Sequence, residues 1–172
     1  MYSHDGLKDS LTNLAAPPLF YEELRRELSR ARRNNGEVLV VRLLLQDFEE
    51  SAPEVGCDVD QLSGKEDEEP NDPEREILEF SQILKGATRG EDVCSRVGER
   101  EFLTLFQGEI LQPEPFISRL NNIWTSKQRV LTLLAAFTRS ISGEGGLELL
   151  NRLDLEPMAR VISKSKFLSS HE

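Results

Sequence analysis

VLVVRLLL, residues 38–45, gives the clearest indication of the fold of this chain. A nearly continuous apolar run of this length, rich in β-branched residues, predicts a central strand buried on both faces. A helix is expected before it over residues 17–33, because Phe20, Leu24 and Leu28 recur at steps of four on one helical face. The strand and the helix together indicate a sheet covered by helices.

Further elements alternate along the rest of the chain. The other expected helices are residues 73–85, ending at Gly86, residues 114–124, and residues 147–163, the last interrupted near Pro157. The other expected strands are residues 92–97, 101–106 and 129–137. The strands 92–97 and 101–106 form a hairpin with a turn at residues 98–100, which requires an antiparallel pair. The order predicts an α/β (α+β) fold with a mostly antiparallel sheet flanked by helices.

The charge of the chain is concentrated in one segment. Of the 172 residues, 21 are basic and 31 acidic, and residues 51–72 alone hold eight acidic and one basic residue. This segment has no aromatic residue and is rich in Pro, Gly and Ser, which predicts a flexible acidic surface loop inserted in a single domain spanning 1–172. The loop is either a solvated linker or a docking site for a basic partner. The acidity argues against nucleic-acid binding.

Composition excludes several classes of protein. No apolar run approaches the roughly 20 residues of a membrane helix, and the N-terminus lacks a secretory signal, so we expect no membrane partner and a cytoplasmic location. The two cysteines, Cys57 and Cys94, form neither a disulfide framework nor a zinc-binding pair. The only histidines, His4 and His171, lie near the termini, which argues against histidine catalysis and a histidine metal site. Cys94 and Trp124 are expected in the core.

Several short motifs, taken in order, resemble the GGDEF domain, the fold of diguanylate cyclases. Residues 9–14, DSLTNL, resemble the D-x-L-T-G-L start of that family, and residues 96–102, RVGEREF, stand where the family has R-x-G-G-D-E-F. Residues 130–136 resemble its V-T-x-S-x-G strand, and Leu153-Asp154 resembles the A-D pair of its last helix. The resemblance covers roughly residues 9 to 165, and it implies a sheet like that of the nucleotide cyclases.

The signature turn, Gly98-Glu99-Arg100-Glu101-Phe102, departs from the family. Family members condense two GTP molecules, and carboxylates hold the divalent metal that bridges the phosphates. By the resemblance, Glu99 replaces the second glycine, Arg100 replaces one metal-binding acid and Leu44 the other. The resemblance therefore implies a degenerate domain with no catalytic residues and no metal site, an inactive pseudo-enzyme. A GTP receptor using Arg100 is a further alternative, which the charge of Glu99 opposes.

Residues 89–92, Arg-Gly-Glu-Asp, match the RxxD motif of the family's product-binding inhibitory site. An arginine fork can bind guanine O6 and N7, and an aspartate can accept from the guanine N1 and amino groups. By the resemblance, Arg89 and Asp92 bind cyclic di-GMP, and Arg119 supplies an additional arginine. The alternative is an ordinary surface ion pair.

Two classes of function follow from these motifs. The first is a non-catalytic cyclic di-GMP signalling protein, which needs no cofactor and relays its signal through a protein partner or a homodimer. The second is a protein-interaction scaffold that binds no nucleotide. Only the first needs the RxxD motif, and the sequence does not identify the partner.

Overall fold

The computed structural model describes residues 6–47, 72–107 and 112–161, and the expected acidic loop at 51–72 lies outside them except for its last residue. The helices are α1 (Pro17–Asn34), α2 (Pro73–Ala87), α3 (Pro113–Trp124) and α4 (Gly146–Leu155). The strands are β1 (Leu39–Asp47), β2 (Val93–Arg96), β3 (Glu101–Phe106), β4 (Leu131–Arg139) and β5 (Ala159–Arg160). No helix among the described residues is long and apolar enough to cross a membrane.

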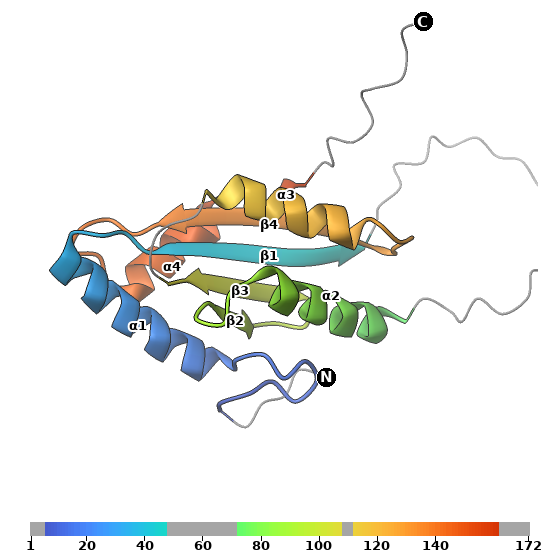
Figure 1. The fold of residues 1–172 in the computed structure, drawn as a ribbon, viewed down its shortest axis with the longest axis horizontal. Helices are drawn as coiled ribbons and strands as arrows, with labels where there is room; N and C mark the ends of the chain where they lie inside the picture. Colours follow the sequence, from blue (N-terminus) through green and yellow to red (C-terminus); the bar gives the residue numbers. More distant parts are fainter. Residues whose placement is uncertain (1–5, 48–71, 108–111, 162–172) are drawn as a thin grey trace, which may run out of the picture.

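The strands form one sheet in the order β2-β3-β1-β4-β5, with every neighbouring pair antiparallel. β1 lies in the middle and pairs with both β3 and β4, as Figure 1 shows. The predicted central strand and the predicted α/β fold with an antiparallel sheet are therefore confirmed.

Two apolar clusters pack on the two faces of this sheet. The first joins α2 and α3 to the sheet around Phe80 and Trp124, which are both fully buried. The second joins α1 and α4 to the opposite face around Phe20 and Leu149. Because side chains alternate along a strand, β1 contributes to both clusters, which is why its sequence is apolar almost throughout.

Two details of the expected elements are wrong. The last helix ends at Leu155 and does not reach residue 163, because Pro157 disfavours a helical conformation at Glu156, which is extended. The chain then forms β5 against β4. Gly86 lies inside α2, which ends at Ala87.

The segment before α1 extends the sheet beyond β2. Ala15 pairs with Ser95 of β2 on one side and with Lys8 on the other. The backbone N–H of Ala15 donates to the carbonyl of Cys94 at 3.0 Å. The edge of β2 is thereby covered by the chain's own N-terminal residues, which brings residues 8–16 next to the RxxD turn.

Candidate functional site

The signature turn connects β2 to β3 at one end of the sheet. The register of β1 with β3 places Leu44 opposite Glu101 and Leu43 opposite Phe102. Gly98 fits closely, because an added Cβ would lie 3.2 Å from the Cβ of Glu101. The structure therefore brings together the two chain segments that the sequence assigned to one site.

Arginines engage the carboxylates of this corner. The Nε of Arg42 donates to Oε1 of Glu101 at 2.6 Å, and its Nη1 lies 3.4 Å from Oδ1 of Asp154 in α4. Arg100 donates to Oδ2 of Asp47 at 2.8 Å. Leu44 lies between Arg42 and Asp47 along β1, and its side chain has no oxygen. Sequence reasoning missed Arg42, whose only signal was a charge inside an apolar strand.

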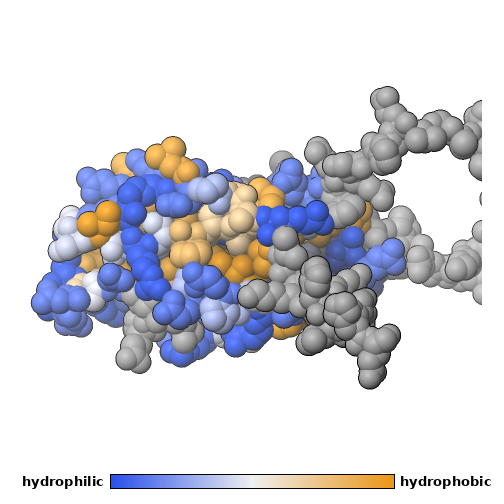
Figure 2. Space-filling view, turned by 90° about the horizontal axis from the view of Figure 1, so that it is seen from above, coloured by the Kyte–Doolittle hydropathy of each residue, from blue (hydrophilic) through white to orange (hydrophobic). Residues whose placement is uncertain are grey.

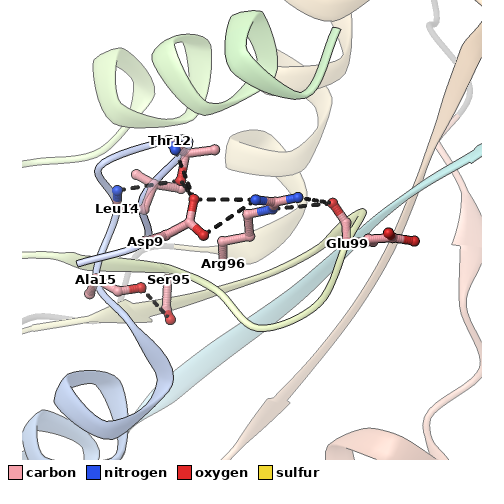
Figure 3. A network of polar contacts seen from close by, with 7 residues as sticks. All are labelled: Asp9, Thr12, Leu14, Ala15, Ser95, Arg96 and Glu99. Carbon is pink, nitrogen blue, oxygen red and sulfur yellow. Dashed lines mark hydrogen bonds and ion pairs between the residues drawn. The ribbon is translucent and has the colours of Figure 1, made fainter. Parts of the chain in front are cut away.

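A buried network holds the signature turn to the N-terminal segment (Figure 3). Nη1 of Arg96 lies 3.3 Å from both carboxylate oxygens of Asp9, while its Nε and Nη2 donate to the carbonyl of Glu99 at 3.2 and 2.8 Å. Asp9 also accepts from the N–H and the hydroxyl of Thr12 at 2.7 and 2.6 Å. Arg96 therefore holds the signature turn through the carbonyl of Glu99, and the Asp9 carboxylate holds the Arg96 guanidinium in place.

Asp92 closes the RxxD turn with its side chain. One carboxylate oxygen accepts the N–H of Arg89 at 2.9 Å, and the other accepts the N–H of Gln107 at 3.1 Å. The N–H of Asp92 in turn donates to the carbonyl of Arg89 at 3.2 Å. Asp92 thus ties the start of β2 to the end of β3 through backbone N–H groups.

Arg119, on α3, contacts the chain just before the RxxD turn. The Nη2 of Arg119, on α3, donates to the carbonyl of Ala87 at 2.8 Å, two residues before Arg89. Both arginines are exposed. Among the described residues, no hydrogen-bond or ion-pair partner is found for the guanidinium of Arg89. The binding roles predicted for Arg89, Asp92 and Arg119 stay predictions.

A pocket of about 350 Å³ lies beside the RxxD turn and is lined by Arg89, Asp92, Lys8 and Lys85. Sequence reasoning missed both lysines. Lys85 lies four residues before Arg89, so the sequence could have indicated it as a neighbour of the motif, whereas no sequence pattern indicated Lys8. Cys94 also lines the pocket, and burial raises the pKa of its thiol. Cys94 is therefore a core residue, as the sequence predicted, like the fully buried Trp124.

A larger hollow of the described surface, about 630 Å³, lies elsewhere, at the β4 edge between α3 and the end of α4. Figure 2 looks onto this side and shows hydrophobic surface flanked by hydrophilic surface. Ile117, Ala135 and Phe137 contribute apolar lining, while Arg139 and Arg152 lie among its polar residues. None of the residues predicted to bind ligand lines this hollow.

Within the ranges that the structure describes, no three His, Cys, Asp or Glu side chains are grouped so as to hold a metal ion. At the signature turn, the Leu44 side chain has no oxygen to bind a metal ion, Arg100 is cationic, and the Glu101 carboxylate is bound to Arg42. This set of side chains does not suit a divalent cation, which needs several oxygen ligands.

The fold is that of GGDEF domains. The structure is similar to the GGDEF domain of DgcB from Caulobacter crescentus in complex with cyclic di-GMP, with a TM-score of 0.67, 16% identity, and coverage of 90% of this chain and 87% of that one. It is also similar to the diguanylate cyclase SiaD of Pseudomonas aeruginosa in complex with its activator SiaC, with a TM-score of 0.64, 22% identity and 86% coverage of this chain. This chain spans 55% of that SiaD chain.

A third similar structure is a microbial GGDEF domain described in its interaction with cyclic di-GMP, with a TM-score of 0.63, 15% identity, and coverage of 87% of this chain and 86% of that one. No family model matches the sequence, and no curated protein matches it. At these identities the likeness establishes the fold, and it leaves the activity and the ligand to be argued from the site.

Proposed function

We propose that this protein is a non-catalytic cyclic di-GMP signalling protein that binds the dinucleotide at Arg89, Asp92 and Arg119 and relays the signal to a protein partner. One observation supports the proposal: Arg119 donates to the carbonyl of Ala87, two residues before Arg89, and both arginines are exposed. Two planar arginine forks so placed suit guanine edges and phosphate groups.

The similar structures support the class of ligand and the relay. The DgcB domain is described in complex with cyclic di-GMP, and SiaD in complex with an activator protein. Both share the fold of this chain, in which the RxxD turn follows α2 and leads into β2. A ligand bound at this turn would contact the end of α2, the start of β2 and, through Arg119, α3. By joining these three elements it would pass a signal to a partner.

The side chains at the signature turn support the absence of catalysis. Metal-assisted phosphoryl transfer needs carboxylates that are available to a divalent cation. Here the Glu101 carboxylate binds the Arg42 guanidinium, and Arg100 places positive charge where the resembled family has an acid. A GTP–metal complex would have to displace the Arg42–Glu101 ion pair and would still meet Leu44 in place of a ligand.

A scaffold that binds no nucleotide is the second candidate, and one observation favours it. Both carboxylate oxygens of Asp92 already accept backbone N–H groups, so Asp92 has a structural role without any ligand. Each oxygen retains a second lone pair, which a guanine N1 or amino group could use. Asp92 is therefore compatible with both candidates, and Arg89 discriminates between them.

Calorimetric titration of the purified chain with cyclic di-GMP tests the proposal. Arg89→Ala is expected to lower the affinity about 30- to 150-fold, because a charged bidentate contact is worth about 2–3 kcal/mol. Arg119→Ala is expected to weaken binding as well. Arg33→Ala, on the exposed end of α1, is the matched control and should bind as the wild type does.

Two results would contradict the receptor function. The first is no heat of binding by the wild type at high micromolar dinucleotide. The second is unchanged affinity in Arg89→Ala. In either case the scaffold function would be retained. Arg89→Lys separates charge from shape, because a lysine keeps the charge but cannot form the planar fork.

A further inference from the structure

The residues before α1 fold into a small hairpin with hydrogen bonds of its own. In this N-terminal hairpin, residues 7–16, the N–H of Asp9 donates to the carbonyl of Leu14 at 2.9 Å. The N–H of Ala16 donates to the carbonyl of Leu7 at the same distance. Because donor and acceptor both belong to the hairpin, these bonds do not depend on where the hairpin lies on the sheet.

A second set of contacts docks the N-terminal hairpin on the outer edge of β2. The N–H of Ala15 donates to the carbonyl of Cys94 at 3.0 Å. The hydroxyl of Ser95 donates to the carbonyl of Ala15 at 2.8 Å, and the Arg96 guanidinium lies 3.3 Å from the Asp9 carboxylate (Figure 3). The docked hairpin thereby covers a strand edge that would otherwise be open to another strand.

The N-terminal hairpin also forms part of the pocket beside the RxxD turn. Two of its residues, Leu14 and Ala15, line this pocket of about 350 Å³. Arg89 and Asp92, to which the proposed function assigns the ligand, line the same pocket. A ligand held there by Arg89 and Asp92 would therefore contact the RxxD turn and the docked hairpin together, and undocking would remove one wall of its site.

We propose that the N-terminal hairpin is a strap whose docking on β2 is coupled to ligand binding at the RxxD turn. The inference deepens the proposed function and rests on it for the identity of the ligand, cyclic di-GMP. A ligand that contacts the docked hairpin binds the docked state more tightly, and by linkage it stabilises docking by the same factor. The covering of the β2 edge then depends on the ligand, which gives the proposed relay a surface that changes on binding.

Amide hydrogen exchange of the full chain, followed by NMR with and without cyclic di-GMP, measures the coupling. The Ala15 amide reports docking, because its N–H is bound to the carbonyl of Cys94. The Val41 amide, in the fully buried middle of β1, reports opening of the whole domain. Without ligand, Ala15 should exchange faster than Val41, and saturating cyclic di-GMP should slow Ala15 at least about fivefold, the lower end of typical coupling factors.

Two buried serines give a matched pair of variants. Ser95→Ala removes the hydroxyl that binds the Ala15 carbonyl, and in the free protein it should speed exchange of the Ala15 amide about fivefold, as expected for one lost hydrogen bond. Ser81→Ala is the control, since the Ser81 hydroxyl donates at 2.7 Å to the carbonyl of Leu78 within α2. It should leave the exchange of Ala15 unchanged. Thermal unfolding of both variants checks that they are folded.

The outcomes separate this inference from the proposed function. If calorimetry shows that cyclic di-GMP binds, but the Ala15 amide exchanges equally fast with and without it, the strap is wrong and the receptor function is retained. Exchange of Ala15 no faster than that of Val41, or equal exchange of Ala15 in Ser95→Ala and Ser81→Ala, would also show that the hairpin does not undock as proposed. If cyclic di-GMP does not bind, the receptor function is wrong and the coupling fails with it.

Discussion

The guanidinium of Arg96 lies 3.3 Å from the carboxylate of Asp9, and the two side chains are only 2% and 0% exposed. They are 87 residues apart in the sequence, yet each belongs to one of the motifs that carry the family resemblance. The pair connects the segment before α1 to the signature turn, because Arg96 also binds the carbonyl of Glu99. The resembled motifs are therefore partly structural, and their retention does not require catalysis.

Asp9→Ala is expected to destabilise the domain by about 3–5 kcal/mol, because it removes the buried carboxylate that faces the Arg96 charge. Urea unfolding followed by circular dichroism measures the loss. Asp154→Ala is the control, since Asp154 is 67% exposed and its ion pair with Arg42 should contribute less than about 1 kcal/mol. A loss under 1 kcal/mol in Asp9→Ala would show that the buried pair does not hold the turn.

Incubation of the purified chain with GTP and either magnesium or manganese is expected to yield no cyclic dinucleotide. The reason is the side-chain set at the signature turn, where Leu44 and Arg100 cannot bind a divalent cation and Glu101 is engaged by Arg42. Chromatography of the reaction products provides the measurement. Product that forms in the wild type and disappears in Glu101→Ala would contradict the non-catalytic proposal.

Lowering the pH is expected to reduce the stability that Glu144 contributes. Two hydrogen bonds from Arg152, at 2.6 and 2.9 Å, are the main reason that the pKa of Glu144 lies below its ordinary value. Because the folded pKa is lowered, the contribution is complete above the unfolded pKa of about 4.3 and is lost as the pH falls through the folded one.

Thermal unfolding of the wild type and Glu144→Gln between pH 7 and pH 2 measures this effect. The wild type should be the more stable protein at pH 7, and the difference should shrink below about pH 4.3, the ordinary glutamate value. A difference between wild type and Glu144→Gln that stays constant across the range would refute the assignment.

Deletion of residues 54–70 is expected to leave a cooperatively folding domain. The reason lies in the composition of this acidic segment, which lacks aromatic residues, and in the weak dependence of loop-closure entropy on loop length. Chemical unfolding of the deletion variant should give a single transition close to that of the full chain. Failure of the variant to fold would mean that the segment is part of the core.

The fold was predictable because its strongest signals are local and repetitive. The apolar run of residues 38–45 and the helical spacing in residues 17–33 depend only on which faces must be buried. The helix expected over residues 17–33 ends close to its predicted last residue, where Asn35 adopts the left-handed conformation, with φ at 49°. The prediction that the last helix continues past Pro157 was wrong. This segment forms β5 by pairing with β4, and no pattern within residues 156–161 indicates that partner.

The order of the elements, the central strand and the positions of the RxxD and signature motifs were predictable from the sequence, because hydrophobic periodicity and turn residues act over short distances. The contacts of the charged residues depend on the tertiary structure. It paired Arg42 with Glu101, buried Asp9 against Arg96, and brought Lys8 to the RxxD turn. Such contacts join segments distant in the sequence, and their partners follow from strand register and packing, which no local pattern specifies.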